Sequence, residues 1–368
     1  MTTAPDAAAV RAACTRVLSY DPPQSARDVL RSLVAYARDD LEHDNFGTGA
    51  IHDQLERRVC DILGKEAAIF FPAGRVAQLA TLKALCEMRG DRRVAMHPRC
   101  HLQEYEDRAY DHVYGLTAVT LGEPNRPNHA ADLDEVRDPL GAIALEVPLL
   151  SLGCRAPSWS ELTCIASRAR ERGIPIHLDG ARLWEVAPWY GRSHREIASL
   201  FDTVSVSFYK SLGAMAGGAV AGPADVIALV RRWQQRLGAA PFQMFPLVLD
   251  ALRGLQERLH LVPRFHERAV EIAAALSGLP GVFVNPDPPH ATSMQVLLRG
   301  DPQRLITAAL EVSSRTGIWL VDFSFPAPLA GYAMFPVTVA SGALEIADDE
   351  VRDAIVEVQR LMSAEPRR

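Results

Sequence analysis

Two stretches of the chain decide its fold, Ile174-Pro-Ile-His-Leu-Asp-Gly-Ala-Arg182 and Val204-Ser-Val-Ser-Phe-Tyr-Lys210. Both contain short apolar runs of the kind that form buried strands. Asp179 closes the first run, and Lys210 follows the second. Because open α/β sheets bind ligands beyond the carboxyl ends of their strands, we expect both side chains to face one site. A helix-capping Asp179 and a solvent-exposed Lys210 are the ordinary alternatives.

The sequence around these stretches alternates between helical and strand patterns, which predicts an α/β protein with a mostly parallel sheet covered on both faces. After residue 262 a helix is expected over residues 265–277, and the strand patterns that follow lie closer together. That spacing indicates a smaller α/β domain with an antiparallel sheet. The predicted organisation is a helical arm over residues 1–44, a large domain over 45–262 and a small C-terminal domain over 263–368.

The composition excludes several classes of protein. The formal net charge of -6 argues against a nucleic acid as the main partner. The six cysteines are scattered and include no C-x-x-C pair, so neither a disulfide framework nor a zinc site is expected. The N-terminus lacks the apolar core of a signal peptide, and no stretch approaches the roughly 18 apolar residues of a membrane span. We therefore expect a soluble, cytoplasmic protein with no metal and no membrane partner.

Three further positions offer groups that would complete a ligand site. Gly74 joins an expected strand to an expected helix, where backbone amides can bind an anion. Ser207 could add a hydroxyl donor there. His101 could present a flat imidazole face, with His97 as its rival. A commonplace junction glycine, a buried strand serine and a structural histidine remain the alternatives.

Together these groups match what pyridoxal 5'-phosphate (PLP) needs from a protein. A lysine bonds to the cofactor as a Schiff base, and an acid keeps the pyridine nitrogen protonated so that the ring can accept electrons. Amides at a helix start hold the phosphate, and a flat group stacks on the ring. Lys210 and Asp179 would supply the first two groups. A desolvated Lys210 would have a lowered pKa and be a competent amine.

The order of these segments and the residues in them resemble those of the threonine aldolase and aromatic β-eliminating lyase family of fold-type-I PLP enzymes. The resemblance covers about residues 45–237. The pair Asp-Gly-Ala-Arg and Lys-x-Leu-Gly-Ala, in this order, is its most specific part. The matching segments are Gly64-Lys-Glu-Ala-Ala-Ile-Phe, Pro72-x-Gly74, His177-Leu-Asp-Gly-Ala-Arg182, Lys210-x-Leu-Gly-Ala and Arg231-Arg-Trp-Gln-Gln-Arg-Leu-Gly.

The resemblance implies an aspartate aminotransferase-like fold whose large domain holds a mostly parallel, seven-stranded sheet. It implies Lys210 as the lysine that bonds PLP, Asp179 beside the pyridine nitrogen and His101 stacked on the ring. Arg182 would grip the carboxylate of an amino acid substrate. The residues at the phosphate would be Gly74, Arg75 and Ser207. Members are usually homodimers or homotetramers that share active sites.

The sequence departs from the family pattern in three places. Threonine aldolases usually carry Leu-Glu-Asn-Thr-His-Asn, whose histidine approaches the substrate β-hydroxyl, and Leu149 stands here in its place. Pro241-Phe-Gln243 replaces a Met-Arg-Gln whose arginine reaches a neighbouring subunit's phosphate, and Arg75, in place of a threonine, could supply that charge. The C-terminal strand at residues 333–338 lacks a second arginine, so Arg182 must hold the carboxylate alone or with another group.

The expected function is a PLP-dependent carbon-carbon lyase of the threonine aldolase type. It would cleave or form the Cα–Cβ bond of a β-hydroxy-α-amino acid, giving glycine and an aldehyde. Because Leu149 cannot accept a proton, a different acceptor or an altered substrate is necessary. The alternatives are PLP-dependent β-elimination or racemisation and, from another class, a non-catalytic scaffold. Retention of Lys210, Asp179 and Arg182 argues against the scaffold.

Overall fold

The structure, a computed structural model, describes residues 6–364. They form two compact units. The larger spans Ser25–Leu261, and the smaller combines residues from Val262 onward with the described residues up to Gln24. The sequence predicts a separate arm over residues 1–44, and its described part, from residue 6 onward, is divided between the two units.

The larger unit is built on a seven-stranded sheet of order β2-β8-β7-β6-β5-β3-β4. Strand β8 runs antiparallel to β2 and β7, and the other neighbouring strands are parallel to one another. The predicted mostly parallel sheet is therefore confirmed. The strands are β2 (Ala67–Phe71), β3 (Arg93–Met96), β4 (Thr117–Thr120), β5 (Ala142–Glu146), β6 (Ile176–Gly180), β7 (Thr203–Ser207) and β8 (Gly218–Gly222).

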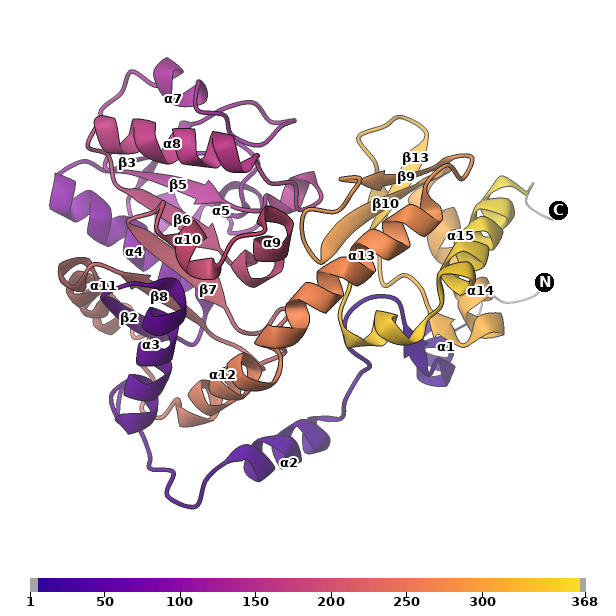
Figure 1. Cartoon of the computed structure of the whole chain (residues 1–368), viewed down its shortest axis with the longest axis horizontal. Helices are drawn as coiled ribbons and strands as arrows, with labels where there is room; N and C mark the ends of the chain where they lie inside the picture. The colour runs from indigo at the N-terminus through magenta and orange to yellow at the C-terminus, as the bar shows by residue number, and fades with distance from the viewer. Residues whose placement is uncertain (1–5, 365–368) are drawn as a thin grey trace. The chain divides into compact units, whose positions relative to one another are not determined.

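Helices surround this sheet, as Figure 1 shows for β3, β5, β6 and β7. Helices α4 and α11 pack against each other and contact the strands. Their shared core includes Leu79, Leu82 and Val230, packed with Ile69 and Val220 of the sheet. The helices are α2 (Ala26–Tyr36), α3 (Ala50–Leu63), α4 (Gly74–Arg89), α5 (His101–Glu104), α6 (Ala109–His112), α7 (Asp132–Glu135), α8 (Trp159–Glu171), α9 (Leu183–Tyr190), α10 (His194–Ala198), α11 (Ala224–Arg236) and α12 (Phe245–Glu257).

The strand register brings the carboxyl ends of β5, β6 and β7 together. Glu146 pairs with Asp179 across β5 and β6, and Asp179 pairs with Ser205 across β6 and β7. In parallel strands these ends meet at one edge of the sheet, where α/β proteins place their ligands. Ser207 ends β7, and Lys210 follows in the loop that leads to β8.

The smaller unit holds a four-stranded antiparallel sheet of order β12-β13-β10-β9, and β1 pairs with β11 in parallel. The antiparallel sheet agrees with the sequence prediction. Helix α13 begins at Val262, three residues before its predicted start, because Pro263 fits the first turn of a helix. The elements are α1 (Ala7–Ala13), β1 (Arg16–Val17), α13 (Val262–Leu276), β9 (Val282–Asn285), β10 (Ser293–Arg299), α14 (Pro302–Thr316), β11 (Ile318–Trp319), β12 (Phe325–Pro326), β13 (Tyr332–Thr338) and α15 (Asp348–Ser363).

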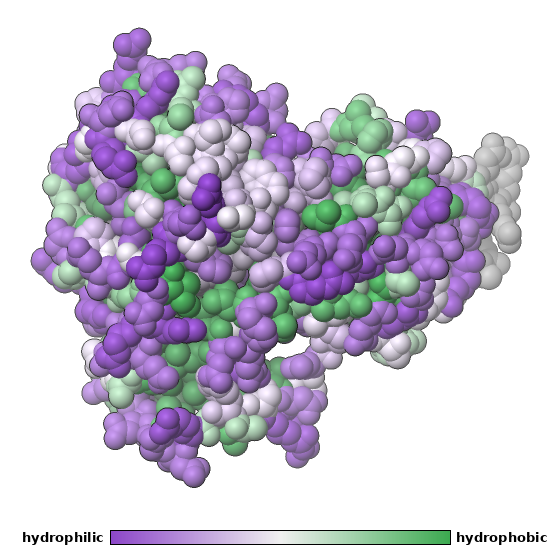
Figure 2. All heavy atoms as spheres, viewed as in Figure 1, coloured by the Kyte–Doolittle hydropathy of each residue, from purple (hydrophilic) through white to green (hydrophobic). Residues whose placement is uncertain are grey.

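Hydrophilic side chains are spread over the face drawn in Figure 2, with apolar side chains in smaller patches between them. Among residues 6–364, no helix combines the length and the apolar character that a membrane crossing needs.

Candidate active site

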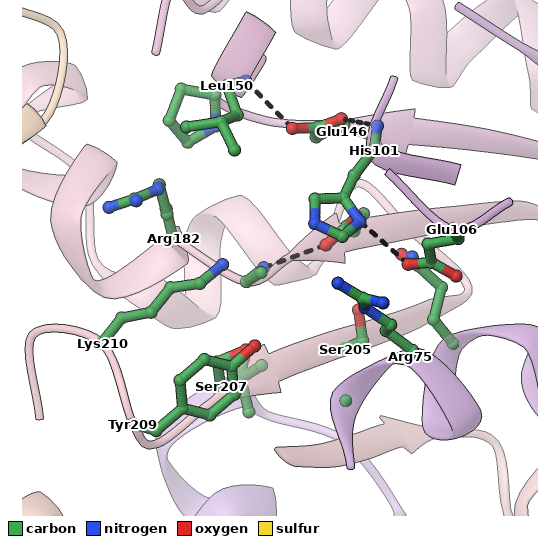
Figure 3. A pocket seen from close by; sticks show the side chains of 16 residues that line it. Arg75, His101, Glu106, Glu146, Leu150, Arg182, Ser205, Ser207, Tyr209 and Lys210 are labelled. Atoms are coloured by element: carbon green, nitrogen blue, oxygen red, sulfur yellow. Dashed lines mark hydrogen bonds and ion pairs between the residues drawn. The ribbon is translucent and has the colours of Figure 1, made fainter. Parts of the chain in front are cut away.

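A pocket lies at the carboxyl edge of the larger sheet, bounded by β5, β6, β7, the start of α4 and the loop after β7 (Figure 3). Every site residue that the sequence predicts lines this pocket. They are Gly74, Arg75, His101, Asp179, Arg182, Ser207 and Lys210. The structure therefore brings together groups that are spread over more than a third of the chain.

Lys210 is the one lysine of this pocket, and the whole sequence contains only three. Lys65 donates to the Phe201 carbonyl at 2.5 Å, and Lys83 lies over the Trp233 ring, so both serve elsewhere. Burial lowers the pKa of Lys210, and the positive charge of Arg182 lowers it further. A lower pKa increases the fraction of neutral amine, which is the nucleophilic form.

Two carboxyl groups close adjacent strands at the base of the pocket. Asp179, 9% exposed, ends the apolar run of β6 and accepts a hydrogen bond from the Ala181 amide at 3.2 Å. Glu146, at the end of β5, accepts from the backbone amides of His101 at 2.6 Å and Leu150 at 2.9 Å. Burial and the nearby Asp179 charge raise the pKa of Glu146 to about 7. Glu146 was not singled out from the sequence, although it closes β5 much as Asp179 closes the apolar run of β6.

His101, rather than His97, faces the pocket. His97 is buried, and its Nε2 lies 2.8 Å from the Glu123 carbonyl and 2.9 Å from the Arg126 carbonyl, which is a structural role. The His101 ring lines the pocket, with its Nδ1 2.9 Å from Oε1 of Glu106. That hydrogen bond raises the pKa of His101, against the opposing effect of burial. Glu106 was not singled out from the sequence.

The start of α4 forms the anion-binding end of the pocket. No side chain caps this 16-residue helix, so its first amides are available to an anion. A Cβ added at Gly74 would lie 3.7 Å from the Ser207 Oγ, and one added at Gly218 would lie 3.3 Å from the Gly74 Cα. Glycines at both positions thus let helix and strand approach closely. Arg75, on the same helix turn, is exposed, and its side chain extends along the pocket wall (Figure 3).

Arg182 is held in place by a buried carboxylate. Its Nη1 donates to Glu185 Oε2 at 2.7 Å, and the Ser211 hydroxyl donates to the other oxygen of Glu185 at 2.7 Å. Glu185 therefore joins Arg182 to the residue that follows Lys210. The Arg182 side chain is 12% exposed and lies on the same side of the pocket as Lys210 (Figure 3).

The wall between β5 and α8 differs from the sequence interpretation. Leu149, the residue aligned with the family histidine, is 2% exposed and packs into the hydrophobic core. Pro148 and Leu150, on either side of it, line the pocket instead. This wall is therefore apolar. Leu149 does not line the pocket, because its side chain lies in the core.

Comparisons with known proteins identify the family of the chain. The profile of the beta-eliminating lyase family matches residues 33–297. The chain is 28% identical over 280 residues to low-specificity L-threonine aldolase 1 of Arabidopsis thaliana, covering 73% of this chain and 77% of that protein.

Two crystal structures are similar over almost the whole chain. One, a putative L-allo-threonine aldolase from Listeria monocytogenes, has 29% identity and a TM-score of 0.89 over 96% of this chain and 98% of that one. The other, a putative aromatic amino acid beta-eliminating lyase/threonine aldolase from Exiguobacterium, has 30% identity and a TM-score of 0.90 over 96% and 99%. The chain therefore belongs to the beta-eliminating lyase family of PLP-dependent enzymes and has their fold type I.

Proposed function

We propose that this protein is a PLP-dependent lyase that cleaves, or forms, the Cα–Cβ bond of a β-hydroxy-α-amino acid, giving glycine and an aldehyde. The observation that carries the proposal is the meeting of Lys210, Asp179, His101 and Arg182 in one pocket next to the uncapped start of α4. The threonine aldolases among its relatives support the choice of reaction.

The pocket fits PLP in the chemistry of its groups. The close approach of Gly74 and Ser207, together with the free amides of α4, suits a phosphate. Asp179 would lie beside the pyridine nitrogen, and His101 would stack on the ring. Arg75 is the cation nearest in sequence to the phosphate end, and replacement by threonine, Arg75→Thr, is expected to weaken cofactor affinity. Unchanged affinity in an equilibrium titration would refute that role.

When bound, PLP supplies an acceptor for the electron pair left on the substrate Cα. Lys210 would provide a neutral amine for bonding to the cofactor, and its Nζ would afterwards carry protons to and from Cα. Arg182 would bind the substrate carboxylate, and Glu185 would hold the guanidinium in that position. A carboxylate fixed in this way would set which bond at Cα is aligned to break.

β-Elimination or racemisation is the second candidate. The apolar wall of Pro148 and Leu150 favours it, because neither residue can accept the proton of a substrate hydroxyl. Both reactions would use Lys210 as the base at Cα.

Product analysis decides between the candidates. The PLP-loaded protein would be incubated with L-threonine and L-allo-threonine, with Lys210→Ala as the inactive control. Glycine and acetaldehyde in equal amounts would support the aldolase proposal. Keto acid with ammonia, or an inverted stereocentre, would support the second candidate. Failure to bind PLP would favour the scaffold alternative.

Self-association is also proposed, as a homodimer or homotetramer in which subunits share active sites. Light scattering on the purified protein tests it, and a monomer at working concentrations would contradict it.

A further inference from the structure

The wall that Pro148 and Leu150 form bears on which substrates the pocket accepts. In Figure 3 the Leu150 side chain points into the space next to Arg182 and Lys210. Arg182 would hold the substrate carboxylate, and the substrate amine would bond to the cofactor. The group on Cβ is therefore the part of the substrate that is left to contact this wall.

The wall offers no polar partner to that group. Neither Pro148 nor Leu150 has a side-chain donor or acceptor. Glu146 is near, but its two carboxylate oxygens already accept the amides of His101 at 2.6 Å and Leu150 at 2.9 Å. Arg75 lies across the pocket, at the phosphate end (Figure 3). A polar substituent on Cβ, beyond the hydroxyl itself, would therefore lose its water without gaining a partner from the described residues of this wall.

Hydrogen bonds on both sides of the wall hold it in position. The Leu150 amide donates to Oε1 of Glu146, so the carboxylate that closes β5 also fixes where the leucine lies. The hydroxyl of Ser151, the next residue, donates to the Arg99 carbonyl at 2.6 Å. An apolar surface that is in place before the substrate binds needs little further ordering. It can therefore discriminate between substrates by their shape and polarity.

Leu150 leaves apolar surface open to the pocket. It is half-buried, whereas its neighbour Leu149 is 2% exposed and packs into the core. A substrate that covers this surface gains a factor of about four in binding for each CH2 that it buries. The β-methyl of threonine offers one carbon for this contact, and an isopropyl group offers two more. The larger group should thus gain about 15-fold in kcat/KM over threonine.

From this wall we propose that the substrate carries an apolar β-substituent larger than methyl, a branched alkyl or aryl group, and that Leu150 is the residue that selects it. The inference rests on the proposed aldolase function and names its substrate class. Cleavage of such a substrate gives glycine and a branched or aromatic aldehyde. Leu150 contacts the part that becomes the aldehyde, both before and during bond cleavage. Its contribution is therefore to KM more than to kcat.

The test compares β-hydroxyleucine, threonine and β-hydroxyaspartate, which differ only in an isopropyl, methyl or carboxylate group on Cβ. Isopropyl and carboxylate have the same number of non-hydrogen atoms, so this pair isolates polarity from size. Each substrate releases glycine, and one glycine assay on the PLP-loaded protein gives kcat and KM for both β-diastereomers of each. Exchange of the glycine α-proton with deuterated water reports on Lys210 without any β-substituent. The variants are Leu150→Ala, Leu150→Asn and, as a matched control in the same segment, Leu149→Ala.

We expect the unsubstituted protein to prefer β-hydroxyleucine over threonine by about 15-fold in kcat/KM, and over β-hydroxyaspartate by about 100-fold or more. Leu150→Ala should reduce the first ratio to about 4 through a higher KM for β-hydroxyleucine. Leu150→Asn, which has a similar size, should narrow the second ratio by about tenfold because its amide offers a polar partner. Leu149→Ala should keep both ratios, since its side chain does not line the pocket.

An unsubstituted protein that cleaves threonine or β-hydroxyaspartate as efficiently as β-hydroxyleucine would overturn the inference and leave the aldolase proposal in place. A Leu150→Ala protein that keeps both ratios, or whose kcat falls equally for all three substrates, would overturn it as well, because Leu150 would then have only a structural role. If the unsubstituted protein exchanges the glycine proton but releases glycine from none of the substrates, the proposed function itself fails, and the inference falls with it.

Discussion

Placing a histidine at position 149 tests whether the pocket wall is built as the structure describes. The family pattern aligns Leu149 with a histidine that approaches the substrate, so Leu149→His would restore that group if the side chain faced the pocket. In the structure Leu149 is 2% exposed and packs into the core. The substitution should therefore damage the core instead of adding a proton acceptor.

The size of the effect follows from this burial. A fully buried leucine side chain contributes about 2 kcal/mol through removal of its apolar surface from water. Imidazole recovers part of that amount, but its buried nitrogens would lack partners, at a cost of about 1–3 kcal/mol. Leu149→His should thus lower the free energy of unfolding by about 3 kcal/mol. Leu150→His, on the half-buried pocket face, is the control and should change it by less than about 1 kcal/mol.

Urea unfolding of the cofactor-free proteins, followed by far-UV circular dichroism, measures both changes. The cleavage assay on the same variants adds a second comparison, in which Leu150→His alone brings an imidazole into the pocket. A Leu149→His protein that is as stable as the unsubstituted chain and cleaves substrate faster would refute the assignment of Leu149 to the core.

Three other substitutions have expected outcomes. Gly74→Ala leaves room for its Cβ beside Ser207, so the free protein should keep its stability, while PLP affinity in a fluorescence titration falls about tenfold because the phosphate would meet the methyl group. Arg182→Lys loses the two-pronged grip on a carboxylate and should raise the KM for the amino acid about tenfold without changing PLP affinity. Burial lowers the pKa of His177 to about 4. The folded state therefore binds fewer protons than the unfolded state between about pH 4 and 6.5, and stability falls as pH drops through that window, by about 3 kcal/mol in all. In His177→Asn this part of the pH dependence, measured by urea unfolding, should be missing.

Much of the site could be predicted from the sequence because the signals were local. Asp179 and Lys210 follow apolar strands, and Gly74 stands where a strand meets a helix. In parallel sheets these positions converge whatever the intervening loops do. The mostly parallel sheet could also be predicted, because helix and strand patterns alternate along the sequence. The antiparallel strand β8 is hard to predict from the sequence because Gly218-Ala-Val-Ala-Gly222 surrounds a single valine with glycines and alanines, which have weak strand preference.

The groups that support the site could not be found in this way. Glu106 is one of several acids in a polar stretch, and nothing local shows that its side chain is buried against His101. The choice between Leu149 and Leu150 at the pocket wall also depends on the path of the turn after β5. Glu185 looks like an ordinary surface acid of a helix until the fold places it between Arg182 and Ser211.

The central claim, that Lys210 bonds the cofactor, is tested most directly by borohydride reduction of the PLP-loaded protein followed by peptide mass mapping. Reduction makes the lysine–cofactor bond permanent, and the chain offers only three lysines as targets. We predict the cofactor on the peptide that contains Lys210, with Lys65 and Lys83 unmodified and no label in Lys210→Ala. A label on Lys65 or Lys83, or none on Lys210 in a protein that retains PLP, would contradict the account.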